Sequence, residues 1–284
     1  MKAITDFTRQ VRELLCTSVA SVRAMLAVTR FAGPRVGDVS VRHQDAADVV
    51  QRITCGTLGG PRHVHFVTAH TVVTARKDPA LAHALDSGTC FADGLPLVWA
   101  LKAIDPTRHW SRNQHVRGTN TFSAVLQGSS GLPDVRHFLL GGSPEVLSQL
   151  EATLQTELPG TRVVGSASPP FLPVDQVDWE VYRDAIVTSE ATHVWVGLGT
   201  PKQDFVAKKL ADADPDRLYL AVGAGFDFVA GTTKWAPAWM QRHGLEWVFR
   251  LATEPRRLWR RYIYGNSEFL ILVFGQFVRS RLTR

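Results

Sequence analysis

Long apolar runs are missing from this sequence. No stretch reaches the roughly 18 apolar residues that a helix needs to span a bilayer. The nearest candidate, Phe269–Val278, is about half as long and is interrupted by Gln276. The opening residues, MKAITDFTRQVRELL, show neither a continuous apolar stretch nor a convincing cleavage site, so we expect no signal peptide. The sequence therefore predicts a protein that can lie on a membrane and does not cross one.

Cysteine is also scarce. Cys16, Cys55 and Cys90 are far apart and form no metal-type pair, and their odd number argues against a disulfide framework. A reducing cytosol fits this pattern best. Charged residues make up 20% of the 284 residues and hydrophobic residues 45%, which argues against wholesale disorder. The length suits one large α/β domain, or one domain with an appendage.

Most of the chain carries no net positive charge. The excess of positive charge is concentrated near the C-terminal end of the sequence. Residues 242–284 hold nine arginines, no lysine and three acids, which accounts for the whole net charge of +6. The same stretch contains eight aromatic residues. A basic, aromatic segment behind a neutral body indicates an anionic surface as its partner.

Between these ends, helical and strand-like patterns alternate. Strands are expected at His63–Thr68, Thr89–Ala92, Val135–Leu140, Arg162–Val164, His193–Leu198 and Leu218–Val222. Helices are expected at Asp45–Thr54, Asp78–Asp86, Leu95–Ala103, Thr119–Gln127, Pro144–Glu157 and Val177–Thr188, with another ending near Ala211. This alternation predicts a Rossmann-like α/β fold, with a mostly parallel sheet covered by helices on both faces. We expect a helical extension at residues 1–34, the α/β domain at 35–243 and a C-terminal helical membrane-docking appendage at 244–284.

Candidate ligand-binding residues follow the strands, because open parallel sheets bind ligands beyond the carboxyl ends of their strands. Gly141 and Gly142, followed by a helix start, suit either a nucleotide phosphate or an ordinary tight turn. Asp93 suits a general base, or the first residue of an Asp-Gly turn. Gln203 suits a hydrogen bond to a sugar or phosphate, or a helix capping box with Thr200 as the N-cap. No G-x-G-x-x-G fingerprint accompanies these residues, so a dinucleotide site is poorly supported.

Two further patterns are better explained by structure than by metal binding. Asp212, Asp214 and Asp216 form D-x-D-x-D at the amino end of an expected strand, where a solvated turn is favoured. His63 and His65 share one strand face and lack an evident third ligand, so we expect core or edge histidines and no metal.

The C-terminal segment has a distinctive pattern of its own. Pro255 should begin a helix that places Arg257, Arg260, Arg261 and Tyr264 on one face. Leu258, Trp259, Tyr262 and Ile263 supply an apolar and interfacial side. This composition suits a helix that lies in the headgroup layer of a membrane. It also suits a basic helix packed on its own domain, or a helix that binds single-stranded nucleic acid. The following apolar stretch favours lipid over nucleic acid.

Residues 36–275 resemble the WecG/TagA/CpsF glycosyltransferases, family 26, through motifs that occur in order. The motifs are VTAH at 67–70, DG at 93–94, RGTN at 117–120, FLLGG at 138–142, VGLGTPKQD at 196–204, VGAGFDFVAG at 222–231 and GLEWVFRLATEPRRLWRRY at 244–262. The resemblance implies an inverting transferase that moves a sugar from a UDP-sugar to a polyprenyl-diphosphate-linked saccharide during polysaccharide synthesis. It also implies that the reaction takes place on the cytoplasmic face of the bacterial inner membrane. The implied reaction needs no metal and no cofactor. We expect no nucleic-acid partner. The sequence does not determine the oligomeric state, and a homo-oligomer is possible.

The resemblance also assigns residue roles. It implies Asp93 as the base, with Thr68 near it. His70, Arg117, Gly141, Gly142, Gln203 and Asp227 are the implied donor-binding residues, and Arg250, Arg257 and Arg260 are the appendage arginines that complete the site.

The chain departs from the family pattern at a few positions. His70 replaces a usual Asn beside the implied base, Asp204 replaces a Glu, Ala224 and Gly225 are exchanged, and Trp235 replaces an Arg. His70 and Trp235 leave a non-catalytic membrane scaffold as the alternative, beside a less supported nicotinamide-dependent Rossmann enzyme. The sequence names neither the donor sugar nor the acceptor saccharide.

Overall fold

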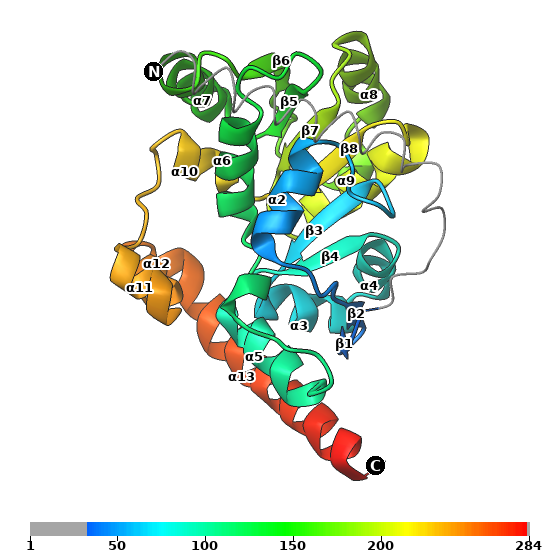
Figure 1. The fold of residues 1–284 in the computed structure, drawn as a ribbon, viewed down its shortest axis with the longest axis vertical. Coiled ribbons are helices and arrows are strands. Elements are labelled where there is room, and N and C mark those ends of the chain that lie inside the picture. The colour runs from blue at the N-terminus through cyan, green and yellow to red at the C-terminus, as the bar shows by residue number, and fades with distance from the viewer. Residues whose placement is uncertain (1–32, 283–284) are drawn as a thin grey trace, which may run out of the picture.

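The computed structural model describes residues 33–282 and contains a six-stranded parallel sheet (Figure 1). Its strand order is β4-β3-β8-β7-β5-β6, and every neighbouring pair runs parallel. The strands are β3 (His63–Val67), β4 (Thr89–Ala92), β5 (Arg136–Gly141), β6 (Arg162–Ala167), β7 (His193–Gly197) and β8 (Leu218–Ala221). The predicted α/β, Rossmann-like class with a parallel sheet is therefore confirmed. The extension predicted at residues 1–34 lies almost entirely outside the described residues.

One face of the sheet is covered by four helices. Because side chains alternate across a strand, Phe66, Leu139, Trp195 and Leu220 all point to this face and join one buried cluster. The covering helices are α2 (Ala46–Thr54), α6 (Gly118–Gly128), α7 (Pro144–Glu157) and α10 (Gly225–Val229). Fully burying each large side chain stabilises the fold by about 1.5–3 kcal/mol.

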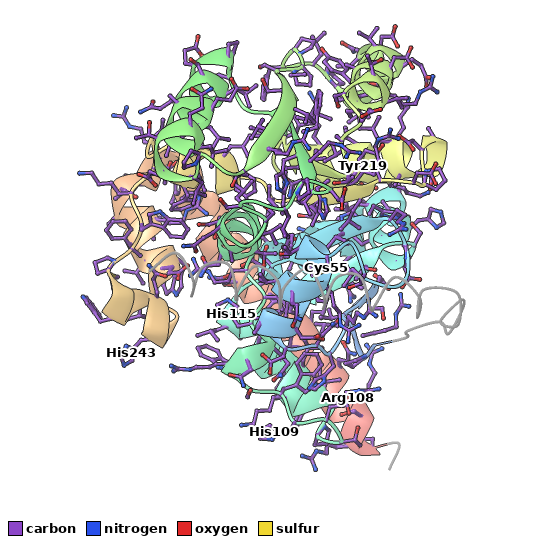
Figure 2. The ribbon with its side chains drawn as sticks, turned by 45° about the horizontal axis from the view of Figure 1, so that its top comes forward. Cys55, Arg108, His109, His115, Tyr219 and His243 are labelled. Carbon is purple, nitrogen blue, oxygen red and sulfur yellow. The ribbon has the colours of Figure 1, made fainter. Side chains whose placement is uncertain are left out.

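The intervening strand residues pack on the opposite face. Phe138, Val194 and Tyr219 contact α8 (Trp179–Thr188) and α9 (Lys202–Ala213) in a second cluster. Toward β4, a third cluster contains α3 (Ala69–Lys77), α4 (Pro79–Asp86) and α5 (Leu95–Ile104). Figure 2 shows Tyr219 among the side chains that fill the space around the sheet. Both faces of the sheet are therefore covered, as predicted.

Three local features differ from the sequence predictions. Helix α3 was not expected, yet it follows β3 directly, and its Val72 and Val73 side chains are buried in the core of the domain. A two-stranded antiparallel hairpin, β1 (Arg35–Val36) and β2 (Val39–Ser40), precedes the parallel sheet. Strand β6 extends to Ala167, three residues beyond the predicted Val164.

The cysteine prediction was wrong in one respect. Cys55 is disulfide-bonded, whereas Cys90 is a buried free thiol. An odd number of cysteines does not exclude a single disulfide bond. Cys16 lies outside the described residues.

The C-terminal segment is helical and packs against the β3–β4 side of the domain. It contains α11 (Ala238–His243), α12 (Glu246–Thr253) and α13 (Pro255–Leu282), and α13 begins at Pro255 as predicted. Helix α13 passes α3 and α5 and continues to the described C-terminus (Figure 1). Phe269 is buried against the domain, and Gln276 accepts a hydrogen bond from Gly37 N–H at 3.0 Å. Within residues 33–282, no helix combines the length and apolar character needed to cross a bilayer.

Candidate functional site

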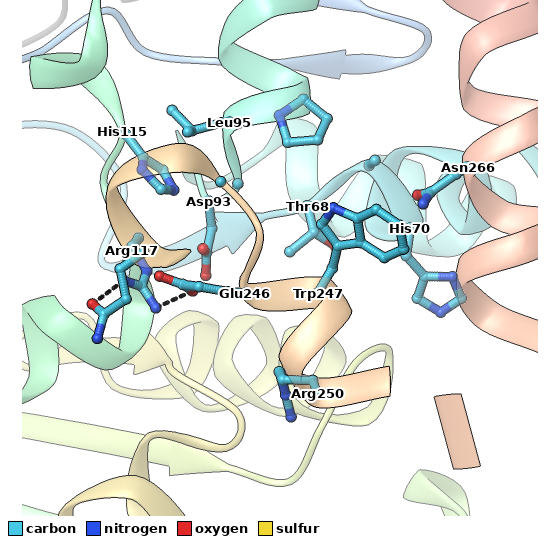
Figure 3. A pocket seen from close by; sticks show the side chains of 15 residues that line it. Thr68, His70, Asp93, Leu95, His115, Arg117, Glu246, Trp247, Arg250 and Asn266 are labelled. Atoms are coloured by element: carbon cyan, nitrogen blue, oxygen red, sulfur yellow. Dashed lines mark hydrogen bonds and ion pairs between the residues drawn. The ribbon is translucent and has the colours of Figure 1, made fainter. Parts of the chain in front are cut away.

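A cavity lies where the C-terminal segment meets the carboxyl ends of β3 and β4 (Figure 3). It encloses about 170 Å³, less than the roughly 300–1,000 Å³ typical of small-molecule pockets. A nucleotide-sized ligand would therefore extend beyond it. Five of the sequence-predicted residues line the cavity, namely Thr68, His70, Asp93, Arg117 and Arg250. Residues that follow β3 and β4 thus meet residues of α12 across about 180 positions of sequence.

Asp93 is held at the cavity by backbone contacts on two sides. Its N–H donates to the Val67 carbonyl at 2.8 Å, which ties the end of β4 to β3. Its carboxylate Oδ2 accepts the N–H of Gly118 at 3.2 Å, and Gly118 begins α6. A helix N-terminus stabilises a negatively charged oxygen. Gly94 follows at φ +110°, a conformation that a side chain would strain, and starts α5.

Thr68 follows β3 and is the N-cap of α3. Its Oγ1 accepts the N–H of Thr71 at 3.2 Å, and the Thr71 hydroxyl accepts the Thr68 N–H at 3.2 Å. This capping box explains why a helix follows a strand without a linker. His70 lies in the first turn of α3, near α13. A Cβ added at Gly265 would lie 3.6 Å from His70 Nδ1.

Arg117 is held by side chains from the C-terminal segment. Its guanidinium donates to Gln241 Oε1 at 3.1 Å and forms an ion pair with Glu246 Oε2. Figure 3 shows Asp93, Arg117 and Glu246 directed toward the same space. Burial raises the pKa of Glu246, opposed by the charge of Arg117 and reinforced by that of Asp93. Sequence reasoning missed Glu246, whose only signal was being one of three acids in an arginine-rich segment.

His115 is a second lining residue that sequence reasoning missed. Burial lowers its pKa to about 4, and the charges of Arg117 and Arg112 act in the same direction. The imidazole is therefore neutral at pH 7. Its Nε2 is buried and has no hydrogen-bond partner among the described residues. His115 thus places a neutral, buried polar ring beside the cavity.

Arg250 brings a positive charge to the cavity from α12. Its guanidinium carbon lies 5.6 Å from the ring centroid of Phe228, which fixes the side chain by a cation–π contact. Its Nε is buried and lacks a hydrogen-bond partner among the residues the structure describes. Arg257 and Arg260 begin α13, and their side chains lie outside the described residues.

The remaining predicted donor-binding residues do not line this cavity. Gly141, Gly142, Gln203 and Asp227 lie at or beyond the carboxyl ends of β5, β7 and β8. Gly141 adopts φ +127°, and a Cβ there would lie 2.5 Å from the Gly197 carbonyl oxygen. The close approach of β5 to β7 therefore requires this glycine. Asp227 lies in α10, and its carbonyl accepts the Thr233 N–H at 3.0 Å, closing the following turn.

Gln203 does not cap its helix as predicted. Helix α9 begins at Lys202 with Pro201 as the N-cap, and Thr200 contributes no cap. The buried Gln203 amide instead accepts the Gly199 N–H at 3.0 Å and donates to the Ala221 carbonyl at 3.3 Å. It therefore joins the loop after β7 to the end of β8. The capping prediction failed because the Gln203 side chain points to the backbone of those loops.

The predicted core histidines are confirmed, whereas the aspartate turn is only partly solvated. His65 Nδ1 lies 2.8 Å from buried Asp204 Oδ1, and His65 Nε2 lies 2.8 Å from His63 Nδ1. Burial lowers the pKa of His63 to about 3. Asp214 is buried and paired with Arg217, which corrects the expectation of a fully solvated turn.

One protein-family profile spans both the α/β domain and the C-terminal segment. Residues 34–283 match the profile of the glycosyl transferase WecG/TagA/CpsF family, a range that includes every cavity-lining residue. Among the described residues, no group of three or more His, Cys, Asp or Glu is placed to hold a metal ion. The match covers nearly all of the chain, and this protein belongs to the WecG/TagA/CpsF family of glycosyl transferases.

Proposed function

We propose that this protein transfers a sugar from a UDP-sugar to a saccharide carried on polyprenyl diphosphate, with inversion at the anomeric carbon. The observation that carries the proposal is a carboxylate and an arginine at one cavity, Asp93 and Arg250. They are 157 positions apart in the sequence and meet where α12 packs over the carboxyl edge of the sheet. A base and a cation at one cavity are what sugar transfer to an alcohol requires.

The proposed reaction is a single displacement. Asp93 takes the proton from the acceptor hydroxyl, and the hydroxyl oxygen forms a bond to the anomeric carbon. The bond from that carbon to the UDP oxygen breaks, and UDP leaves with the electron pair. Arg250 offsets the charge that develops on the diphosphate, a role that arginine's planar donors suit. Attack opposite the leaving group gives a β-linkage from an α-linked donor.

We also propose that α13 lies on an anionic membrane, which delivers the lipid-linked acceptor. Four apolar side chains recur every four residues along its solvent side. They are Leu270, Phe274, Val278 and Leu282, exposed by 66%, 69%, 38% and 80%. Arg279 and Arg281 follow in the last turn. An apolar stripe bordered by arginines fits the headgroup layer of a bilayer with anionic lipids.

A donor screen against a lipid-linked acceptor tests the proposed reaction. The product should gain the mass of one sugar residue, and UDP should raise the melting temperature, because a ligand that binds the native state stabilises it. NAD should leave the melting temperature unchanged. Folded protein that binds UDP and transfers no sugar from any donor would instead be the non-catalytic scaffold. A shift with NAD alone would overturn the UDP assignment.

A further inference from the structure

Helix α13 is apolar on two sides of its axis. One side is the exposed apolar stripe that begins at Leu270. The other side packs on the domain through Gly265, Phe269 and Leu272, at the four- and three-residue spacing of a helix that packs on a neighbour. Either side is apolar enough to meet lipid, so apolar character alone does not decide which side packs on the domain.

Gln276 continues the row that faces the domain, and it contacts the β1–β2 hairpin. Its Oε1 accepts the Gly37 N–H at 3.0 Å, and its Nε2 donates to the Arg35 carbonyl at 2.6 Å. A carbonyl and an N–H two residues apart point to the same edge of a strand. The Gln276 amide therefore pairs with the edge of β1 as a neighbouring strand would, while the opposite edge of β1 pairs with β2. An apolar side chain cannot satisfy these two backbone groups.

The hairpin is shaped to receive this side of α13. Val36 and Val39 are fully buried and belong to the same cluster as Phe269. Gly37 lies in the turn at φ +58°, and a Cβ added there would lie 3.3 Å from Leu272 Cδ1. The turn thus approaches the helix closely one helical turn before Gln276, and the packing and the two hydrogen bonds act at the same place.

A second polar contact joins α13 to the domain at a more exposed position. Lys77 on α3 and Glu268 form an ion pair whose side chains are 64% and 43% exposed. Water and salt screen such pairs, so they specify an arrangement weakly. A polar group that finds its partners in one arrangement only is a stronger determinant, as a single buried Asn is in a coiled coil. Gln276 is such a group, because a turn of α13 about its axis would take the amide away from both backbone partners.

We propose that Gln276 fixes the rotation of α13 on the domain and thereby decides which apolar side of the helix meets the membrane. The proposal rests on the membrane docking of α13 given under the proposed function. With the amide on β1, the stripe that contains Phe274 is directed away from the domain, toward lipid. The residue that interrupts the apolar run at Phe269–Val278 thus gives that run a defined lipid-facing side.

A double-mutant cycle on vesicle binding tests the proposal. Phe274 and Gln276 are two positions apart and lie on opposite sides of the helix. Phe274→Ser should weaken co-sedimentation with anionic vesicles by about 10-fold in the wild-type background. In the Gln276→Leu background the loss should be less than about threefold, because a helix free to turn can present its other apolar side.

Glu268→Gln is the matched control, since it removes the exposed ion pair and keeps the Gln276 amide. In that background the Phe274→Ser loss should remain about 10-fold. A full 10-fold loss in the Gln276→Leu background would overturn the proposal, because the lipid-facing side would then be fixed without the amide. A loss that shrinks equally in the Glu268→Gln background would also overturn it.

Hydrogen exchange gives a second readout, without lipid. Gln276→Leu should speed amide exchange at Gly37 and across residues 269–282 by about 10-fold or more, because two hydrogen bonds are lost. Gln276→Glu keeps the acceptor for Gly37 and loses the donor to Arg35. Its effect should be intermediate, and it replaces the leucine variant if that variant fails to fold. Unchanged exchange across residues 269–282 in both variants would exclude Gln276 as the restraint. Wild-type protein that does not bind anionic vesicles would instead defeat the membrane docking, while the exchange result would still decide whether Gln276 fixes α13.

Discussion

Replacing Asp93 by asparagine separates two roles of the carboxylate, namely taking a proton as the proposed base and accepting a structural hydrogen bond. The carboxylate Oδ2 accepts the Gly118 N–H at the start of α6, and the asparagine oxygen can accept the same bond. Asparagine cannot take a proton from an alcohol. General-base catalysis contributes about 10²- to 10⁴-fold, so kcat should fall by that factor. At 1.36 kcal/mol for each tenfold, this corresponds to about 3–5 kcal/mol of transition-state stabilisation.

Asp93→Ala separates the two roles further. Alanine removes the base and the acceptor, leaving the Gly118 N–H without its side-chain partner. An unsatisfied polar group costs about 1–3 kcal/mol, which corresponds to a fall in Tm of roughly 2–4 °C for each kcal/mol in a protein of this size. Both variants should therefore lose the same turnover, and only the alanine variant should lose stability.

Initial rates at saturating donor and acceptor, with calorimetric Tm values, provide the assay. The asparagine variant should bind UDP as tightly as the wild type, because the contacts expected to hold the diphosphate are unchanged. Turnover within threefold of wild type in a folded Asp93→Asn protein would refute the base assignment. Equal losses of Tm in both variants would refute the hydrogen-bonding argument.

Four further results are expected. Gly141→Ala should lower Tm, because its φ of +127° and the 2.5 Å approach to Gly197 O both oppose a Cβ; strain of this kind costs about 1–3 kcal/mol. Arg250→Ala should lower kcat by about 10²-fold, and Arg250→Lys should restore little, as steady-state rates will show. Burial lowers the pKa of His193 from 6.5 to about 4. As the pH falls, the unfolded chain therefore binds a proton at His193 before the folded protein does. Stability should decrease as the pH drops through this interval. His193→Gln should make the fall of Tm with pH less steep there, because His63, His115 and His137 also have lowered pKa values. Phe274→Ser should weaken co-sedimentation with anionic vesicles by about 10-fold without lowering Tm.

The strands were predictable because each is a short apolar run that ends at a glycine or a polar residue. His63–Val67 and His193–Gly197 are buried along nearly their whole length, and burial on both faces removes the polar alternation that a half-exposed strand would show. Helix α3 was missed for a different reason. Its residues, AHTVVTARK, include threonines and valines with modest helix propensity. Tertiary packing of Val72 and Val73 decided the conformation there.

The candidate site was predictable only where position alone determines it. Asp93 and Thr68 follow neighbouring parallel strands, and the carboxyl ends of such strands must meet at one edge. Gln203 follows another strand of the same sheet, yet its amide is used by the backbone of Gly199 and Ala221. Sequence spacing cannot separate these outcomes, because it places a residue near the edge without fixing its rotamer. Glu246 required knowledge of how α12 packs on the domain.

The charges around the cavity limit what Arg117 can do. The sequence resemblance implies that Arg117 binds the donor, yet its guanidinium already has the Glu246 carboxylate as a partner. A diphosphate would have to displace that carboxylate or leave Arg117 engaged, and displacement would leave Glu246 buried beside Asp93. Arg250 lacks such a cost, because its Nε has no hydrogen-bond partner among the described residues. UDP carries more than one negative charge on its diphosphate, so one arginine does not balance it. If Arg117 stays with Glu246, we propose that the appendage arginines Arg257 and Arg260 supply the remaining positive charge.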